Sequence, residues 1–480
     1  GRKKKQKERR RKEKKKEKKE RRREKEGNKD MAPRGFDASI STAELQSHSS
    51  REDLWISING KVYDVTEWLS SHPGGDIPLL SLAGQDLTEA FLAFHPASAF
   101  THLPQFLIGT LSDHHTISAL SANYRKTLSD LKKAGLFKKD LSIYYRIFAA
   151  IALMLLLSVS GVLLSDRSSV HILSAVLLGC VWSQCGWIGH DAGHSPLLNK
   201  PYLDRAIALL VGNCVSGISI SWWKRNHNAH HISCNSLEYD PDLQYIPIFA
   251  VSTKLFSSMY SYFYDRKMSF DPVARLLVSY QHLTFYPVMA IARINLFAQT
   301  VILLLSRKTK IKNRGTEICG ILFFWAWFLS LLSCLPSHWE RAAFVLVSFA
   351  VTGIQHVQFC LNHFSSPVYH ERPDGREFAL AQARGTLNLT TPPWMDWFHG
   401  GLQYQVEHHL FPRLPRHNLR KVSSVVKPFC EKHGLPYTCV SFWEANVMII
   451  RTLRTAALQA RDWSKPVPKN LLWEAINSQG

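Results

Sequence analysis

A dense run of histidines constrains this chain more than any other feature. The stretch Trp222–His231 holds three imidazoles within five residues. If the stretch is helical, His227, His230 and His231 stand at i, i+3 and i+4 and share one face. A neutral imidazole is the commonest metal ligand in proteins and suits iron, zinc and copper. One such run is equally compatible with a polar surface patch.

Two further clusters repeat the pattern. His190 and His194 stand at i, i+4, and the segment Gln405–His409 ends in two adjacent histidines at i+3 and i+4. Each cluster lies beside an apolar stretch, where an exposed polar patch has no reason to recur. The three clusters are called the first box (His190–His194), the second box (His227–His231) and the third box (Gln405–His409). Together they predict a metal centre, with their seven histidines and Gln405 as its ligands.

Cysteine usage and charge limit the class of protein. All nine cysteines lie between Cys180 and Cys439, and none forms C-x-x-C, which indicates a protein facing a reducing compartment and not a disulfide scaffold. Residues 1–30 hold 19 Lys and Arg against 7 Asp and Glu, so they carry 12 of the 21 net positive charges. This segment lacks the apolar core of a signal peptide. It is interpreted as an extension upstream of Met31, the alternative being an arm for nucleic acid or acidic lipid.

The segment after this extension predicts a small α+β module. Ser41–Leu45 reads as a capped helix start, and Leu54–Ile58 and Lys61–Val65 read as two strands joined by an Asn59-Gly60 turn.

Two histidines in this module predict a haem site. His72 opens His72-Pro73-Gly74-Gly75-Asp76, a tight turn that presents the imidazole outward, and His95 follows 23 residues later. Two such histidines on opposite sides of an apolar crevice can supply both axial ligands of a haem. No C-x-x-C-H motif is present, so the haem would be bound non-covalently.

Residues 38–112 closely resemble a cytochrome b5 domain. The resemblance rests on Trp55, the two strands through Val65, His72–Asp76 and His95-Pro96. It implies that His72 and His95 are the ligands of haem b, and that the module passes single electrons at the cytosolic face of the endoplasmic reticulum.

The rest of the chain alternates apolar runs with polar segments. The runs long enough to cross a bilayer core of ~30 Å, or nearly so, are Tyr144–Leu164, Val170–Ile188, Phe285–Leu305, Ile318–Leu335 and Ala342–Leu361. The first two form a hairpin, and the stretch Tyr202–Ile220 is interrupted by polar residues and reads as interfacial or re-entrant.

The number of membrane crossings between the second and third clusters decides whether all three clusters lie on one side of the membrane. If all five crossed, the third histidine cluster would lie across the membrane from the first two, and no shared site could form. Phe285–Leu305 contains Arg293, Asn295 and Gln299, which are costly at mid-bilayer, and a short basic loop follows it, which the positive-inside rule keeps cytosolic. This run is therefore expected to lie along the interface. Four transmembrane helices remain, with all three clusters and the haem module on the cytosolic side.

The chemistry expected of the clusters is oxidative. Removal of hydrogen from an unactivated methylene requires a metal with dioxygen, because side chains alone supply no such oxidant. Zinc has no redox chemistry, so the neighbouring haem module favours iron. Seven histidines and a glutamine suit two ions, and Asp191 and Glu407 are candidates to orient the ligands. His356, His399 and His417 are expected to be hydrogen-bonded or exposed instead. No nicotinamide or flavin motif is present, so electrons must come from another protein.

The clusters and the fused haem module resemble the plant front-end desaturases, in which glutamine replaces histidine at the start of the third box. The resemblance extends through Asn235–Gln244, Ser279–His282 and Ala456–Asp462. It departs at Ser195-Pro196, where an aromatic residue is expected after the first box. It implies a non-haem di-iron enzyme that uses dioxygen and electrons relayed from NADH by a cytochrome b5 reductase. The implied iron ligands are His190, His194, His227, His230, His231, Gln405, His408 and His409, with His363 as a weaker addition.

Substrate choice rests on resemblance alone. Phe270–Arg275 and Phe442–Val447 are similar to the sphingolipid type, which implies Δ8 desaturation of the long-chain base. The alternatives are Δ6 desaturation of acyl lipids, a lipid hydroxylase on the same metal site, and a non-enzymatic electron-transfer anchor. Nucleic acid is not an expected partner.

The expected fold is an α+β cytochrome b5-like haem domain fused to an all-α integral membrane desaturase domain with four transmembrane helices and a cytosolic histidine-box cap, in the endoplasmic reticulum membrane. The expected parts are a basic extension (1–30), the haem domain (38–112), a linker with an interfacial helix (113–142), the membrane desaturase domain (143–420) and a C-terminal cap (421–480).

Overall fold

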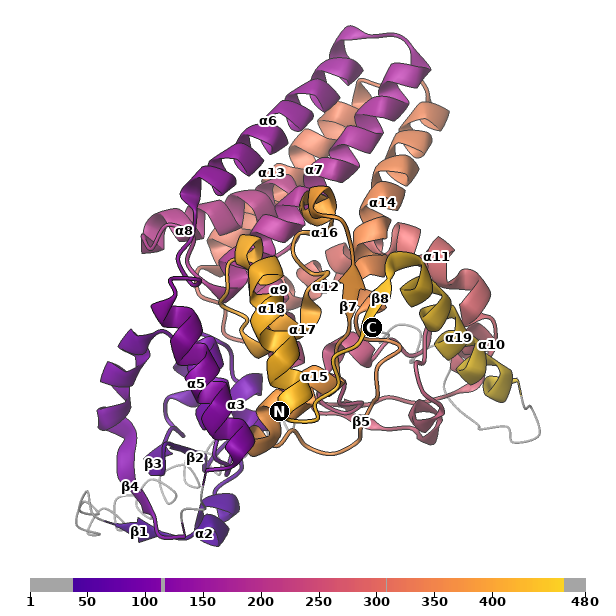
Figure 1. The fold of residues 1–480 in the computed structure, drawn as a ribbon. Helices are drawn as coiled ribbons and strands as arrows, with labels where there is room; N and C mark the ends of the chain where they lie inside the picture. Colours follow the sequence, from indigo (N-terminus) through magenta and orange to yellow (C-terminus); the bar gives the residue numbers. More distant parts are fainter. Residues whose placement is uncertain (1–37, 114–116, 308, 462–480) are drawn as a thin grey trace, which may run out of the picture. The chain divides into compact units, whose positions relative to one another are not determined.

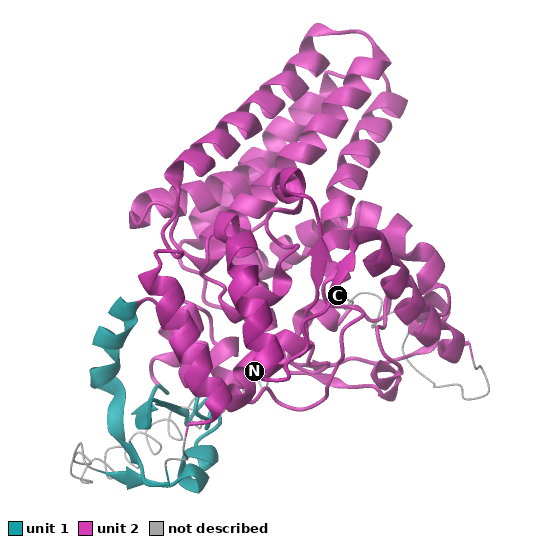
Figure 2. Cartoon of the chain, in the orientation of Figure 1, with its two compact units in different colours: residues 1–66, 83–86, 97–115 teal, residues 67–82, 87–96, 116–480 magenta. Residues whose placement is uncertain are grey.

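The computed structural model describes residues 38–113, 117–307 and 309–461. The basic extension predicted for residues 1–30 lies outside them. Contacts divide the chain into two compact units (Figure 2). Unit 1 comprises the described residues up to Thr66 together with 83–86 and 97–113, and unit 2 comprises 67–82, 87–96 and the described residues from 117 onward.

Unit 1 is built on a four-stranded sheet with the order β1-β4-β3-β2. Its strands are β1 (Ser39–Ile40), β2 (Trp55–Ile58), β3 (Lys61–Asp64) and β4 (Leu107–Leu111). The predicted hairpin is confirmed, because Ile58 pairs with Lys61 across Asn59 and Gly60, which have φ values of 51° and 72°, as a type I′ turn requires. The predicted helix start is also confirmed, since Ser41 Oγ accepts a hydrogen bond from the Glu44 amide and caps α2 (Thr42–Ser47). Ile40, Leu45, Trp55 and Val62 form the core.

Unit 2 begins with the short helices α3 (Ile77–Ser81) and α4 (Thr88–Phe94), which lie between the two predicted haem ligands. A helix in the predicted linker, α5 (Ala119–Lys133), follows them along the chain.

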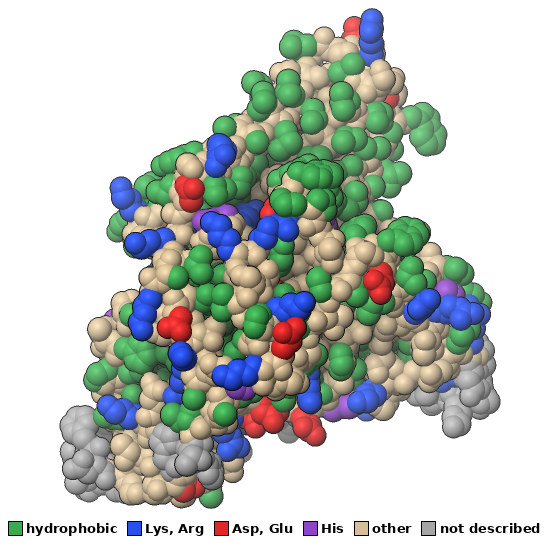
Figure 3. All heavy atoms as spheres, in the orientation of Figure 1, with side chains coloured by type: hydrophobic (Ala, Val, Ile, Leu, Met, Phe, Trp, Pro, Cys, Tyr) green, Lys and Arg blue, Asp and Glu red, His purple; other side chains and the backbone are tan. Residues whose placement is uncertain are grey.

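Four helices in the described part of unit 2 are long and apolar enough to cross a membrane. They are α6 (Leu141–Leu164), α7 (Ser168–His194), α13 (Arg314–Ser333) and α14 (His338–Leu361), and they run side by side in Figure 1. Large apolar side chains such as Leu156 and Leu164 are exposed on α6, and hydrophobic side chains gather over these helices in Figure 3. Such a surface suits contact with lipid.

Two bent helix pairs account for the other apolar stretches. The pair α8 (Pro201–Ala208) with the π-helix η4 (Leu209–Val215) and α9 (Ile220–Ile232) bends by 105°, and α11 (Gln281–Ile291) with α12 (Arg293–Leu305) bends by 64°. Counting each bent pair as one span would raise the four described spans to six. Phe285–Leu305 was predicted not to cross, and the break at Ala292 interrupts it.

α7 and α14 form the central helix pair of unit 2. A Cβ atom added at Gly179 would lie 2.6 Å from Cβ of Val351, and one added at Gly186 would lie 2.5 Å from Gln355. Close approach therefore needs glycine at both positions. The contact partner on α14 moves from Val351 to Gln355 as the position on α7 moves from Gly179 to Gly186. The two helices therefore run in the same direction. Their C-terminal ends meet at the same end of the bundle.

The remaining elements pack around the ends of α7, α9 and α14. They are the helices α10 (Pro272–Ser279), α15 (Phe378–Arg384), α16 (Asp396–His399), α17 (Gln405–Leu410), α18 (Arg416–Lys432) and α19 (Phe442–Ala460), and the strands β5 (Tyr260–Ser261), β6 (Arg266–Lys267), β7 (Asn388–Thr390) and β8 (Cys439–Ser441). This part is mostly helical, and its two small sheets, β5-β6 and β7-β8, were not predicted. All nine cysteines are free thiols, in agreement with the expectation of a protein without a disulfide framework.

Candidate functional site

The three histidine clusters lie on three short helical stretches. His190 and His194 occupy the last turns of α7, which ends where Ser195 turns to extended backbone before Pro196. His227, His230 and His231 lie on α9, whose first turn is capped by Ser219 Oγ accepting from the Trp222 amide at 3.1 Å. Gln405, His408 and His409 lie on α17, and His363 follows the end of α14. Every predicted iron ligand is buried except His194, which is partly exposed.

These stretches bring the imidazoles together in two groups. In the first group, ligand atoms of His190, His194, His227, His231 and His408 all lie within 4.8 Å of one another. Nε2 of His227 is 2.9 Å from Nε2 of His194 and 3.0 Å from Nε2 of His231. Nε2 of His408 is 3.1 Å from Nε2 of His231.

The second group holds the remaining predicted ligands. Its members are His230, Cys234, His363 and His409, again within 4.8 Å. Nε2 of His230 and Nε2 of His409 are 3.3 Å apart, and the Gln405 side-chain amide lies 3.0 Å from Nε2 of His363. His363 therefore stands in the group, although the sequence marked it as the weaker candidate. His231 and His409 stack with ring centroids 4.2 Å apart, which places the two groups next to each other.

The donor atoms fit metal ions. Nε2 of His190, Nδ1 of His231 and Oε1 of Gln405 are buried and have no hydrogen-bond partner in the described structure, a costly arrangement unless a ligand satisfies them. Burial holds the pKa of His363, His408 and His409 well below the usual range of histidine. These rings are therefore neutral, the form that binds a metal. A site rich in imidazole suits iron, copper or zinc and not magnesium or calcium.

The second nitrogen of several rings is held by a neighbouring oxygen atom. Nδ1 of His230 lies 2.9 Å from the Asp240 carboxylate, Nδ1 of His409 lies 2.8 Å from Oε1 of Gln382, and Nδ1 of His363 lies 3.0 Å from the Gly385 carbonyl oxygen. Each oxygen accepts a hydrogen bond from Nδ1, so Nε2 is the nitrogen of each ring that faces a metal.

The sequence did not predict three residues of this site, Cys234, Gln382 and Asp240. Cys234 and Gln382 belong to no repeated spacing. Asp240 lies in Tyr239–Asp242, which reads as a turn, although an acidic residue ten positions after a box histidine is a usable signal.

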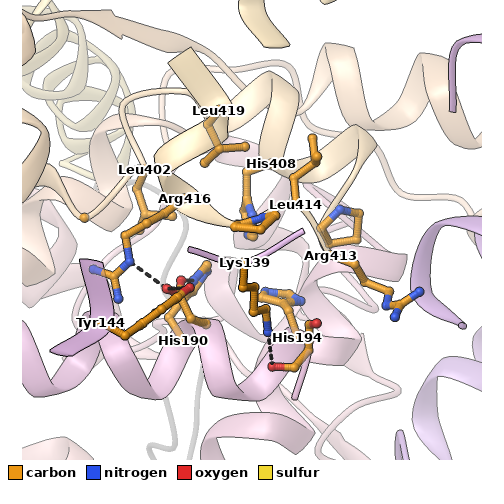
Figure 4. A pocket seen from close by; sticks show the side chains of 15 residues that line it. Lys139, Tyr144, His190, His194, Leu402, His408, Arg413, Leu414, Arg416 and Leu419 are labelled. Carbon is orange, nitrogen blue, oxygen red and sulfur yellow. Dashed lines mark hydrogen bonds and ion pairs between the residues drawn. The ribbon is translucent and has the colours of Figure 1, made fainter. Parts of the chain in front are cut away.

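The two predicted orienting carboxylates behave differently. Asp191 accepts from Nε of Arg416 at 2.6 Å and from the Tyr144 hydroxyl at 2.9 Å, and it lies 3.8 Å from Nδ1 of His190. Figure 4 shows Arg416, Tyr144 and His190 converging there. Glu407 accepts from the Tyr437 hydroxyl at 2.7 Å and from the Asn388 amide at 2.8 Å, and from no imidazole in the described structure. The predicted orienting role of Glu407 is therefore wrong.

The segment after the first box, where the sequence departs from the expected aromatic residue, is fixed by a lysine. Nζ of Lys139 donates to the Ser195 carbonyl oxygen at 2.9 Å (Figure 4). Lys139 and Arg413 line a small pocket of about 10 Å³ beside His190, His194 and His408, which has room for about one water molecule.

The three histidines that were not expected to be ligands belong to neither group. Nδ1 of His356 lies 3.4 Å from the Met289 carbonyl oxygen, as expected. His399 is buried and His417 is half-buried, and Nδ1 of each ring has no hydrogen-bond partner in the described structure. The expectation that these two rings are hydrogen-bonded or exposed is therefore wrong.

A long apolar cavity of about 290 Å³ opens beside the second group. One face of α7 lines it from Trp182 to Gly189, and one face of α14 lines it from Thr352 to Cys360. The eight-residue advance from Thr352 to Cys360 spans about 12 Å of helix, so the cavity is long enough for an alkyl chain. His227, His230, His363 and Gln405 stand at one end of it.

The predicted haem ligands lie close together in unit 2. The ring centroids of His72 and His95 are 6.0 Å apart. Nδ1 of His72 donates to the Gly75 carbonyl oxygen at 2.7 Å and Nδ1 of His95 to the Phe91 carbonyl oxygen at 3.1 Å, which leaves the Nε2 lone pair of each ring for iron. Burial lowers the pKa of His95 to about 4, with His72 contributing, so the ring is neutral. The donors thus fit a bis-histidine haem.

Replacing Asp240 by asparagine is expected to weaken iron binding by about 10- to 100-fold, the usual cost of losing a carboxylate partner of a ligand histidine. The amide can still accept a hydrogen bond, but the negative charge beside His230 is lost. Iron retained per protein after dialysis against a graded series of chelator concentrations measures the change.

Asp265→Asn is the matched control, because Asp265 is exposed in the turn between β5 and β6 and accepts only from Tyr260 in the described structure. Equal iron retention by the two variants would contradict the role given to Asp240.

Comparison with known proteins agrees with these observations. The family model described as fatty acid desaturase matches residues 167–441, and the one described as cytochrome b5-like heme/steroid binding domain matches residues 41–112. The chain is 54% identical over 442 residues to Delta(8)-fatty-acid desaturase 2 of Arabidopsis thaliana, covering 92% of this chain and 98% of that protein.

Two further relatives bear on the substrate. The chain is 52% identical to acyl-lipid (9-3)-desaturase of Borago officinalis, covering 92% of this chain and 98% of that protein. It is 37% identical to Delta 8-(E)-sphingolipid desaturase of Lachancea kluyveri, covering 81% of this chain and 70% of that protein. The chain belongs to the fatty acid desaturase family and is an oxidoreductase that carries a fused cytochrome b5-like domain at its N-terminal side.

Proposed function

We propose that this enzyme introduces a Δ8 double bond into the long-chain base of sphingolipids, with dioxygen as oxidant. The observation that carries the proposal is the position of two buried histidine groups at the end of a long apolar cavity. Relatives at 54% and 37% identity are named as Δ8 desaturases, the second of sphingolipids, and this supports the choice of substrate.

The proposed iron ligands divide between the two groups. His190, His194, His227, His231 and His408 hold one ion, and His230, His363, His409 and Gln405 hold the other, with Cys234 as a close neighbour. Two irons with dioxygen supply the oxidising power that removes two hydrogens from adjacent methylene groups.

The protein's own residues orient and shield this site. Asp240, Gln382 and the Gly385 carbonyl hold the ligand rings in one tautomer. The cavity walls bind the alkyl chain and exclude water from the reacting carbons.

The proposed electron route starts outside the chain. Electrons would come from NADH through a cytochrome b5 reductase, and His72 and His95 would hold the haem b that supplies single-electron transfer toward the metal centre. The proposed location is the endoplasmic reticulum membrane. With α6, α7, α13 and α14 as the four spans, the histidine-bearing ends of α7 and α14 lie on the cytosolic side with the haem domain.

Δ6 desaturation of acyl lipids is the second candidate, because the borage relative at 52% identity is named as an acyl-lipid desaturase. A hydroxylase would use the same ligands and differ in its product. An electron-transfer anchor would need no buried imidazole groups, so the two histidine groups argue against it.

Expression of the full chain in yeast, with linoleate fed, tests the proposal. Long-chain bases and fatty acids are both analysed, and cells with empty vector are the control. We expect new Δ8-unsaturated bases and no new acyl product. Δ6 acyl products alone would establish the second candidate, hydroxylated products alone would establish a hydroxylase, and the absence of any new product would contradict desaturation.

A further inference from the structure

One wall of the cavity holds a buried cation without a counter-ion. Arg293, the first residue of α12, is 1% exposed and lines the cavity. Its guanidinium lies 4.0 Å from the ring centroid of Trp182, and one of its nitrogens donates to the Ser216 carbonyl oxygen. Nε has no partner, and Arg293 forms no ion pair within the described residues. A buried charge left unpaired is costly, which points to an acceptor supplied by a ligand.

The distance from this cation to the histidines follows from helix geometry. The guanidinium stands beside Trp182, which lies eight residues before His190 on α7. Eight residues of α-helix advance about 12 Å. Along the axis of α7, Arg293 therefore lies about 12 Å from the turn that carries His190.

We propose that Arg293 binds the oxygen atoms at the polar end of the lipid and thereby sets the position of the double bond. This inference rests on the proposed Δ8 desaturase function. Each bond of an extended alkyl chain advances about 1.25 Å, given bonds of about 1.5 Å and angles near 111°. The seven bonds from C1 to C8, together with one hydrogen bond of about 3 Å, span about 12 Å. In a chain bound to the same cation, C6 lies two bonds before C8 and therefore about 2.5 Å short of the position that C8 reaches.

The same contact selects the form of the substrate. Arginine only donates hydrogen bonds, so its ligand must provide acceptor atoms, such as hydroxyl or amide carbonyl oxygens. A free long-chain base carries an ammonium group, which the guanidinium repels. The one carboxylate among the described residues that line the cavity is Asp242, which stands at the histidine end, 3.6 Å from Nδ1 of His230. The substrate is therefore the N-acylated base, in which the nitrogen is an uncharged amide.

Binding to the purified full-chain holoenzyme in detergent tests this inference without any variant. The probes are N-hexanoyl dihydrosphingosine and free dihydrosphingosine. We expect the free base to bind at least about tenfold more weakly, the effect of one unfavourable charge contact. Equal or tighter binding of the free base would overturn the proposed substrate form.

Variants of Arg293 test its positioning role. Arg293→Gln is expected to raise both the Kd and the KM for the N-acylated base by at least about tenfold, with product no longer confined to Δ8 and with iron content unchanged. Arg293→Lys, which keeps the charge and protects the fold, is expected to show a smaller rise. Arg341→Gln is the matched control, because Arg341 also donates to backbone carbonyl oxygens, of Leu335 and Ser333, but does not line the cavity.

The outcomes separate this inference from the proposed function. Wild-type Δ8 product together with unchanged Kd and unchanged double-bond position in Arg293→Gln would overturn the role of Arg293 alone. Loss of iron from Arg293→Gln and Arg293→Lys alike would also overturn it, since the effect would then be structural. Absence of Δ8 bases from the wild type would contradict the proposed function itself.

Discussion

Replacing His409 by alanine is expected to lower desaturation by more than about a hundredfold, since changes to the partners of metal ligands already cost that much. His409 belongs to the second histidine group and contacts the first through His231. Its Nε2 is 3.3 Å from Nε2 of His230, its ring stacks on His231, and Gln382 fixes its Nδ1. Removing the ring therefore deprives one proposed ion of a ligand and opens space beside the other. Product formation in yeast and iron content per purified protein measure the two effects.

His338→Ala is the matched control for this variant. His338 is exposed at the start of α14 and far along that helix from His363, so its loss should leave both iron content and turnover unchanged. Full iron content and full turnover in His409→Ala would contradict the two-group centre.

Local spacing predicted which imidazoles share a helix face, and it could do no more. His227, His230 and His231 follow from the helical repeat alone. The convergence of α7, α9, α14 and α17 depends on long-range packing, such as the close approach of α7 and α14 at Gly179 and Gly186. The parity argument anticipated that convergence, because only an even number of crossings between the second and third boxes permits a shared site.

The failures of sequence reasoning have a common physical cause. Asp240 and Gln382 contact the ligand histidines through hydrogen bonds that three-dimensional packing creates, and neither lies in a repeated motif. Glu407 was expected beside the imidazoles because it lies next to His408 in the sequence. Successive residues on a helix point about 100° apart, and its carboxylate turns instead toward Tyr437.

The sequence and the structure give different information about Arg293. In the sequence it is a polar residue too costly for the bilayer centre, which excludes a simple crossing. In the structure it opens α12 after a 64° bend and is buried against Trp182 in the cavity wall. The sequence could indicate the cost of that charge, but only packing reveals what stands around it.

Replacing His72 by alanine is expected to remove the haem absorbance and to lower NADH-driven turnover by at least about a hundredfold, because one of two axial ligands is lost. His72 and His95 lie 6.0 Å apart between ring centroids, and each is oriented by a backbone carbonyl oxygen. The iron ligands lie on other helices, so iron content should remain at the wild-type value. Absorbance of the purified protein, iron analysis and turnover with NADH and a cytochrome b5 reductase measure the three quantities.

His102→Ala serves as the control, because His102 is an exposed histidine of the same haem domain. It should keep both haem and turnover. Reduction of His72→Ala by a small chemical reductant should restore product in a single turnover, since the metal centre and the lipid cavity are unaltered. Wild-type turnover with NADH in His72→Ala would show that electrons reach the irons without the fused haem, and iron loss from this variant would show that the haem segment supports the metal centre structurally.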